Sequence, residues 1–153
     1  MKNNIIALFV VSLIACFSVY AQETSKVEIK VKQLVAKYEG VKGVDCNILT
    51  KGSDLGLVKL MIGKEMKGVT AITFFDYSKA SPQTCQALRD DLNVIISMLQ
   101  EFNMDNEKEL AGFDYFRCFA TQLTDNIASD IMIIMENKDS KILMYMAGKI
   151  EAI

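Results

Sequence analysis

The chain has 153 residues, 51% of them hydrophobic, and its 17 basic and 19 acidic residues give a formal net charge of −2. This length fits one domain with a core of its own. A protein that binds nucleic acid needs a basic face along the phosphates, so we expect no nucleic acid as a partner of this mildly acidic chain. The sequence contains no histidine, which excludes Ser-His-Asp and Cys-His catalysis and every zinc site that contains histidine.

The start of the chain has the organisation of a secretory signal peptide. Residues 1–4 include the positive Lys2, and an apolar run follows over residues 5–14. This run is shorter than the roughly 20 residues that span a bilayer, which is typical of a signal peptide. Small or moderate residues precede the bond between Ala21 and Gln22. We therefore predict that residues 1–21 are removed and that the mature chain is exported to the periplasm.

A second cleavage site is the alternative. The stretch Leu13-Ile14-Ala15-Cys16 resembles the motif at which bacterial lipoproteins are cut and acylated. The residues after Cys16 include Phe17, Val19 and Tyr20, whereas a lipid anchor is better followed by a polar tether. We expect cleavage at Ala21, and membrane association only if Cys16 is lipidated, which would anchor the protein in the outer membrane.

The first half of the mature chain reads as alternating helices and strands. Apolar residues at spacings of three and four predict a helix over residues 26–39, and alternation predicts a strand over residues 44–49. Ser53 or Asp54 can cap a second helix, and residues 69–77 are apolar on both faces, as in a central strand. A strand-helix-strand unit favours a parallel pair with a right-handed crossover.

A third helix has the clearest local signal. Ser81 suits the N-cap and Pro82 the first helical position. An apolar stripe then recurs at spacings of three and four, formed by Cys85, Leu88, Leu92, Ile95, Leu99 and Phe102. The acidic residues that follow, over 105–109, resemble a calcium loop, but Leu110 stands where that loop needs glycine. We predict a helical turn there and no metal site.

Three strands follow, over residues 113–123, 130–136 and 141–147, and a compact turn at residues 137–140 makes the last two a hairpin. The predicted fold class is therefore α+β. It is a single domain over residues 22–153, in the order helix-strand-helix-strand-helix and then a C-terminal meander of three strands, with a mixed sheet packed by helices.

The hairpin is apolar on both faces, although an antiparallel hairpin with one wet face should be polar there. Either helices cover both faces or one face meets a partner, which would be an envelope protein or a second copy of the chain. Methionine suits adaptable binding surfaces. The predicted partner surface consists of Met132, Ile134, Met144 and Met146, and the strand over 141–147 could also bind a peptide by strand addition.

Three cysteines remain in the mature chain, Cys46, Cys85 and Cys118. Outside the cytoplasm an odd number allows one disulfide with a spare thiol, an intermolecular bridge or three buried thiols. Each lies at an apolar position of its element, which favours core packing. No CxxC, GxSxG, P-loop or GxGxxG motif occurs. We expect a non-catalytic protein without a cofactor; the alternative is an enzyme that uses a thiol, Cys46 or Cys118, or carboxylates such as Asp114 with Asp130.

Three stretches resemble a known family: "VKQLVAKYEGVKGVDCNILTKG", "MKGVTAITFFDYS" and "ILMYMAGKIEAI". They look like a family of small exported proteins of unknown function from Gram-negative bacteria, whose members carry a leader, a "KYEGxxGV"-like opening and a terminal "GKI". The resemblance covers nearly all of the mature chain and implies an envelope location. Some members look like lipoproteins, as would follow from cleavage at Cys16. The shared motifs concern packing and turns, so the resemblance implies no active site.

Overall fold

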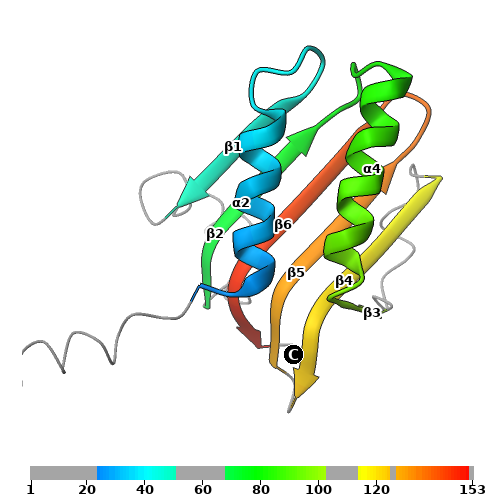
Figure 1. The fold of residues 1–153 in the computed structure, drawn as a ribbon. Coiled ribbons are helices and arrows are strands. Elements are labelled where there is room, and N and C mark those ends of the chain that lie inside the picture. The colour runs from blue at the N-terminus through cyan, green and yellow to red at the C-terminus, as the bar shows by residue number, and fades with distance from the viewer. Residues whose placement is uncertain (1–23, 51–67, 103–113, 125–126, 152–153) are drawn as a thin grey trace, which may run out of the picture.

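The computed structural model describes residues 24–50, 68–102, 114–124 and 127–151. This part of the chain contains two helices and six strands (Figure 1). The helices are α2 (Lys26–Tyr38) and α4 (Pro82–Ile96). The strands are β1 (Asp45–Thr50), β2 (Val69–Asp76), β3 (Gln100–Phe102), β4 (Tyr115–Thr124), β5 (Ile127–Glu136) and β6 (Lys141–Glu151).

The strands form one sheet in the order β1-β2-β6-β5-β4-β3, and every neighbouring pair is antiparallel. Both helices lie on the same face of this sheet, α2 nearer the β1 edge and α4 nearer the β4 edge (Figure 1). β6, the last strand in sequence, lies at the centre between β2 and β5. Neither of the two helices described is long and apolar enough to cross a membrane.

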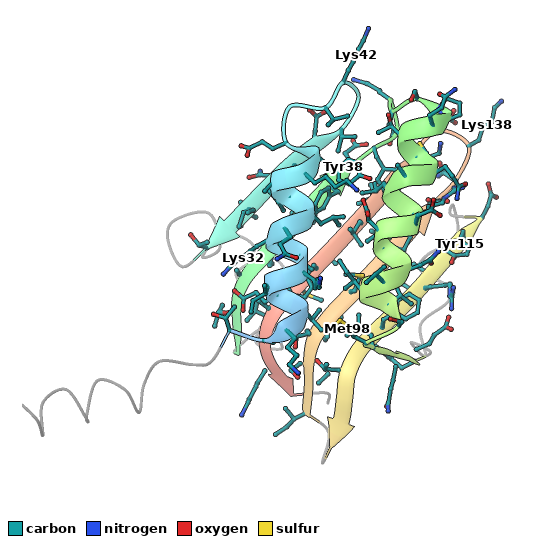
Figure 2. The ribbon with its side chains drawn as sticks, viewed as in Figure 1. Lys32, Tyr38, Lys42, Met98, Tyr115 and Lys138 are labelled. Carbon is teal, nitrogen blue, oxygen red and sulfur yellow. The ribbon has the colours of Figure 1, made fainter. Side chains whose placement is uncertain are left out.

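Helix α2 forms where the apolar spacing predicts it. The Ser25 hydroxyl accepts a hydrogen bond from the Glu28 N–H and caps the first turn. Its buried stripe of Val27, Val31, Leu34 and Tyr38 packs against the sheet. The Tyr38 phenol lies between the two helices (Figure 2) and donates a 2.7 Å hydrogen bond to Asp91 of α4.

Helix α4 also begins as predicted, with Ser81 as the N-cap and Pro82 in the first turn. It is shorter than its apolar stripe, because the chain tightens after Ile96: the N–H groups of Met98 and Leu99 bond to carbonyls three residues back. The last members of the stripe therefore lie outside the helix. Phe102 belongs to β3, where it pairs with Cys118 of β4.

The sheet is apolar on both faces. The helix-covered face holds the main core, which includes Phe75, Tyr77, Phe119, Leu143 and Tyr145, all buried. The opposite face, called the far face below, carries two further clusters of buried side chains. Their buried members are Cys118, Ala120, Ala128, Ile131 and Ile133 in one cluster and Val69 and Ile72 in the other.

The predicted arrangement of the fold is wrong. The described part of the chain is an antiparallel six-stranded sheet with two helices, and not a mixed sheet with alternating helices and strands. β1 and β2 pair antiparallel, from Asp45 opposite Asp76 to Thr50 opposite Ala71, so no right-handed crossover joins them. The apolar character of β2 on both faces reflects burial on both sides of an antiparallel sheet. The helix predicted from residue 53 lies outside the described residues, as does the turn over 105–109.

The C-terminal strands are confirmed only in part. β5 and β6 form the predicted hairpin, in which the Asn137 side chain accepts hydrogen bonds from the N–H groups of Asp139 and Ser140. β6 is not an edge strand, however, because β2 pairs with its other side. Strand addition at residues 141–147 is therefore incompatible with this sheet. The sequence pattern does not predict the short strand β3, because Leu99 just before it and Phe102 at its end continue the apolar stripe of α4.

Candidate functional site

The outer side of Asp45–Thr50, called the β1 edge below, belongs to the longer of the two terminal strands of the described sheet. β1 is a terminal strand of the sheet, and no other described strand pairs with it beyond β2. Its six residues pair with β2 in one continuous register without a bulge. The opposite edge is the three-residue strand β3. An extended, regular edge of this kind offers a row of backbone N–H and C=O groups to another strand.

The side chains of the β1 edge do little to prevent such pairing. Natural edge strands are protected by lysine, proline, bulges or inward-pointing charges, and β1 has neither lysine nor proline; its one charge is Asp45 at the first position. Ile48 is 44% exposed and stands opposite Thr73, on the helix-covered face. Leu49 stands opposite Ile72 and packs with the far-face cluster. An added strand would meet an apolar neighbour on each face.

The structure divides the four residues of the predicted partner surface between two faces. Met132 is fully buried and Ile134 is 5% exposed, and both belong to the core under the helices. Met144 and Met146 are partly buried on the far face, where they pack with both clusters. The four therefore do not form one surface. Met144 stands opposite Ile133, and Met146 opposite Ile131, so the far face combines the methionines of β6 with the odd-numbered isoleucines of β5.

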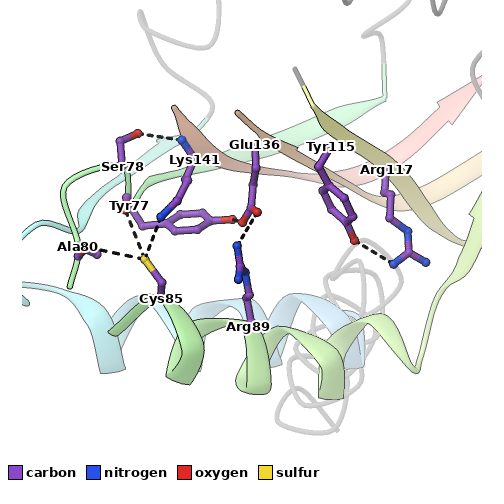
Figure 3. Close-up of polar contacts among 9 residues, drawn as sticks. All are labelled: Tyr77, Ser78, Ala80, Cys85, Arg89, Tyr115, Arg117, Glu136 and Lys141. Carbon is purple, nitrogen blue, oxygen red and sulfur yellow. Dashed lines mark hydrogen bonds and ion pairs between the residues drawn. The ribbon is translucent and has the colours of Figure 1, made fainter. Parts of the chain in front are cut away.

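A second feature is a cavity of about 390 Å³ between α4 and the β4–β5 part of the sheet. Figure 3 shows the polar side chains at one side of this cavity, called the α4 cavity below. Arg89 projects from the helix toward Glu136 of β5, and Tyr77 approaches the same carboxylate from the end of β2. The cavity is lined by Tyr77, Gln86, Arg89, Leu92, Asn93, Ile96, Tyr115, Ile134 and Glu136.

Both oxygens of Glu136 are engaged at the α4 cavity. The Tyr77 hydroxyl donates to Oε1 at 2.6 Å, and Arg89 Nη2 donates to Oε2 at 2.6 Å. Burial raises the pKa of Glu136, but these two hydrogen bonds outweigh it and hold the pKa below its ordinary value. Burial and the bond to Glu136 raise the pKa of Tyr77. The pair is therefore a carboxylate and a neutral phenol, and neither is poised to move a proton near neutral pH.

The three cysteines in the described part of the chain, Cys46, Cys85 and Cys118, are free thiols in different surroundings. Cys85 is buried, and its Sγ lies 3.6 Å from Lys141 Nζ (Figure 3). The pKa of the partly exposed Cys46 is raised to about 11, mainly by burial and further by the negative charges of Glu39 and Asp45. Burial, and to a lesser extent the negative charge of Glu101, raises the pKa of Cys118 to about 11 as well. A nucleophilic cysteine needs a lowered pKa, so these shifts count against the thiol-enzyme alternative.

The carboxylates named in the enzyme alternative do not meet. Asp114 is exposed just before β4, whereas Asp130 lies near the start of β5 and is 5% exposed. The two strands pair antiparallel, with Tyr115 opposite Glu136, which places the two aspartates at opposite ends of the β4–β5 pair. Within the described residues, no three cysteine, aspartate or glutamate side chains are grouped so that they could hold a metal ion.

Asp130 has a structural environment of its own. Its carboxylate accepts hydrogen bonds from the hydroxyls of Ser25, Thr121 and Tyr145, and it borders a cavity of about 280 Å³. Because Ser25 caps α2 and the other two donors lie on β4 and β6, this one carboxylate connects a helix end to three strands. No local pattern predicts this site, since its members are up to 105 positions apart in the sequence.

Comparison of the chain with models of protein families, with curated proteins and with solved structures found no match.

Proposed function

We propose that the mature chain is a non-catalytic protein of the cell envelope that binds an extended segment of another protein as an added strand along the β1 edge. The observation that carries the proposal is the uninterrupted, nearly uncharged outer side of Asp45–Thr50. In strand addition, main-chain hydrogen bonds provide affinity and alternate side chains provide specificity. The signal-like residues 1–21 support the envelope location, and the raised pKa values of Cys46 and Cys118 support the non-catalytic part.

The β1 edge also suggests what the bound segment looks like. Ile48 on the helix-covered face and Leu49 on the far face would each lie beside a side chain of the added strand. Cross-strand apolar and aromatic pairs stabilise neighbouring strands. We therefore expect the segment to carry β-branched or aromatic residues at adjacent positions, one for each face.

A peptide selection with hydrogen exchange tests the proposal. Peptides displayed on phage are selected on the mature chain, and amide hydrogen exchange is then measured with and without the selected peptides. The proposal expects slowed exchange for amides of Asp45–Thr50. Slowed amide exchange confined to another element, or selected peptides that contact only a helix, would contradict the proposal.

The chain offers a matched pair of variants for this experiment. Ile48→Lys places a charge at the β1 edge, and Ile29→Lys places the same charge on α2, at a side chain of nearly equal exposure (44% and 45%). A lysine on an edge strand opposes pairing with another chain. We expect Ile48→Lys to weaken peptide binding by about tenfold, while Ile29→Lys leaves it unchanged. If the two substitutions changed peptide binding equally, the β1 edge would be excluded as the binding site.

Self-association is the competing use of the same edge. Two copies could pair their β1 strands around a two-fold axis. Measuring the mass of the mature chain in solution separates the two cases: a monomer is expected, and a dimer that Ile48→Lys dissociates would replace the partner protein by a second copy.

The mature N-terminus is tested separately. Mass spectrometry of the protein from membrane and soluble envelope fractions should find a chain that begins at Gln22. A chain that begins at a diacylglyceryl-modified Cys16 would establish the lipid-anchored form, with the same domain held at a membrane.

A further inference from the structure

The α4 cavity is separate from the β1 edge. It lies between α4 and the β4–β5 side of the sheet, whereas β1 is the strand at the other end of the order β1-β2-β6-β5-β4-β3. Its volume of about 390 Å³ falls within the range of small-molecule sites, roughly 300–1,000 Å³. A polypeptide added along β1 would not reach it. The two sites can therefore be tested independently.

The wall and the floor of the α4 cavity differ in chemistry. Gln86, Arg89 and Asn93 follow one another at spacings of three and four on α4, so they form a polar stripe beside the helix's buried stripe. The floor is apolar, because Leu92 and Ile134 are buried there and Ile96 lies partly buried beside them. A ligand that fits this cavity needs an apolar body with a polar group at one end.

The polar groups that remain available at the α4 cavity are mostly donors. Arg89 uses Nη2 on Glu136, and its other N–H groups have no hydrogen-bond partner among the described residues. The Asn93 amide likewise bonds to no described residue. The Tyr115 hydroxyl accepts a hydrogen bond from Arg117 Nη1 (Figure 3), which leaves its own hydrogen free to donate. The only charged acceptor is already engaged, since both Glu136 oxygens carry a hydrogen bond, and the other acceptors at the cavity are the neutral amide oxygens of Gln86 and Asn93.

A guanidinium with free N–H groups beside an amide and a phenol is suited to a carboxylate, with which arginine forms two parallel hydrogen bonds. The Arg89 guanidinium compensates the negative charge of Glu136, and the neutral Tyr77 donates a hydrogen bond to the other carboxylate oxygen. Glu136 also fixes the Arg89 side chain, which is 47% exposed, in its position at the cavity. The arginine is thereby pre-organised for a second acceptor.

We propose that the α4 cavity binds a small carboxylic acid with an apolar body, with the carboxylate on Arg89 and the body against Leu92, Ile96 and Ile134. This site is distinct from the polypeptide site proposed at the β1 edge. An apolar floor with a few convergent polar groups is the usual composition of a small-molecule site. The pairing of a charged head with an apolar body excludes both simple inorganic anions and uncharged hydrocarbons as its preferred ligands.

Two probes of the same shape test the proposal on the folded mature chain. 3-Phenylpropionate carries the carboxylate and 3-phenylpropanol replaces it by a hydroxyl, and binding is followed through the methyl resonances of Ile96 and Ile134. We expect the carboxylate to bind about tenfold more tightly than the alcohol, since a charged acceptor strengthens the bond to arginine. Equal affinities, or shifts confined to residues outside the cavity, would overturn the proposal, as would no binding of either probe.

Variants at Arg89 distinguish recognition from loss of fold. Arg89→Gln retains a donor for Glu136 but removes the positive charge. We expect it to lower the affinity for 3-phenylpropionate by about tenfold and to leave the affinity for 3-phenylpropanol unchanged. Arg89→Lys should keep part of the preference. Lys42→Gln, at the exposed tip marked in Figure 2, removes the same charge far from the cavity and should have no effect. A fall in affinity for both probes alike in Arg89→Gln would overturn the role of the carboxylate.

Discussion

The Tyr145 hydroxyl donates a 2.5 Å hydrogen bond to Asp130, and both residues are buried. Asp130 has a φ of 53°, the left-handed region that residues with a side chain seldom adopt. The pairing of β5 with β6 shifts register at this point, between Ser129 and Ile131. The carboxylate thus fills a break in the strand ladder, where it also accepts hydrogen bonds from Ser25 and Thr121.

Asp130→Ala should be strongly destabilising, because it leaves the buried Tyr145 hydroxyl and the partly buried Ser25 hydroxyl without their acceptor, while Thr121 keeps the Ser129 carbonyl oxygen at 2.6 Å. An unsatisfied buried polar group costs about 1–3 kcal/mol, so we expect the free energy of unfolding to fall by about 3 kcal/mol in urea titrations. Asp130→Asn keeps an acceptor and tolerates the left-handed backbone, so its loss should be smaller. Equal stability of the alanine variant and the wild type would show that the cluster contributes nothing to folding.

Gly68 and Gly148 should tolerate no side chain. A Cβ atom on Gly68 would lie 1.4 Å from the Lys149 carbonyl oxygen, and one on Gly148, whose φ is +117°, would lie 2.1 Å from the Gly68 carbonyl oxygen. Alanine at either position must separate β2 from β6, which are neighbours within the sheet. We expect a loss of more than about 3 kcal/mol in unfolding free energy for Gly68→Ala.

The control for the two glycines is Gly40→Ala. Gly40 has a left-handed φ of +76°, which Gly148 shares and Gly68 does not, but nothing lies within 4 Å of the site where its Cβ would be. That variant should lose only the about 1–2 kcal/mol of the backbone preference. A loss of the same size at Gly40 and Gly68 would show that the close approach of the two strands does not matter.

The elements that could be predicted from the sequence are those fixed by neighbouring residues. Ser81 and Pro82 set the start of α4 within one turn of the helix. The turn after Glu136 joins β5 and β6 into a hairpin, and neither feature depends on distant parts of the chain. The orientation of β1 against β2, by contrast, is not set by neighbouring residues. It depends on the register between Asp45 and Asp76, which no local pattern encodes.

The candidate sites were missed for the same reason. Alternation within β5 and β6 correctly separates each strand into two faces, but it does not say which face of β5 continues into which face of β6. Met132 stands opposite Tyr145 and not Met144, and this offset of one residue places the two methionines on opposite faces. The contact of Arg89 with Glu136 joins positions 47 apart, so it exists only once the sheet and α4 have assembled.

The Tyr77–Glu136–Arg89 contacts should make stability depend on acid. Hydrogen bonds from Tyr77 and Arg89 hold the pKa of Glu136 below its ordinary value of 4.5 despite burial. A lowered pKa in the folded state means that the stabilisation is complete above the ordinary pKa and is lost as the pH falls through the folded value. The difference in unfolding free energy between wild type and Glu136→Gln should therefore be largest above about pH 5 and shrink toward about pH 3.

Urea titrations at several pH values measure this difference. Arg89→Gln provides a comparison, because it keeps the carboxylate and removes its cationic partner; its acid dependence should lie between those of the wild type and Glu136→Gln. A constant difference over the whole pH range would contradict the assignment of an ionised, hydrogen-bonded Glu136.

Cys46 should react slowly with alkylating agents although it is partly exposed. Burial and the neighbouring Glu39 and Asp45 raise its pKa to about 11 from an ordinary 9.0, which lowers the thiolate fraction near neutral pH by about 100-fold. A more basic thiolate is a better nucleophile, with a Brønsted slope of about 0.4–0.5, so the rate should be about tenfold below that of an unhindered thiol. The rate should keep rising with pH beyond pH 9, where an ordinary thiol levels off.

Iodoacetamide labelling followed by mass spectrometry measures this rate between neutral and alkaline pH, with a synthetic peptide of residues 42–50 as the unfolded reference and Cys46→Ser to assign the adduct. Cys85 and Cys118 are buried and should stay unmodified in the folded chain. If Cys46 in the folded protein reacts as fast as the peptide at neutral pH, its thiolate is stabilised and not suppressed. That outcome would support a nucleophilic thiol, since an enzyme that uses Cys46 needs the thiolate at its working pH.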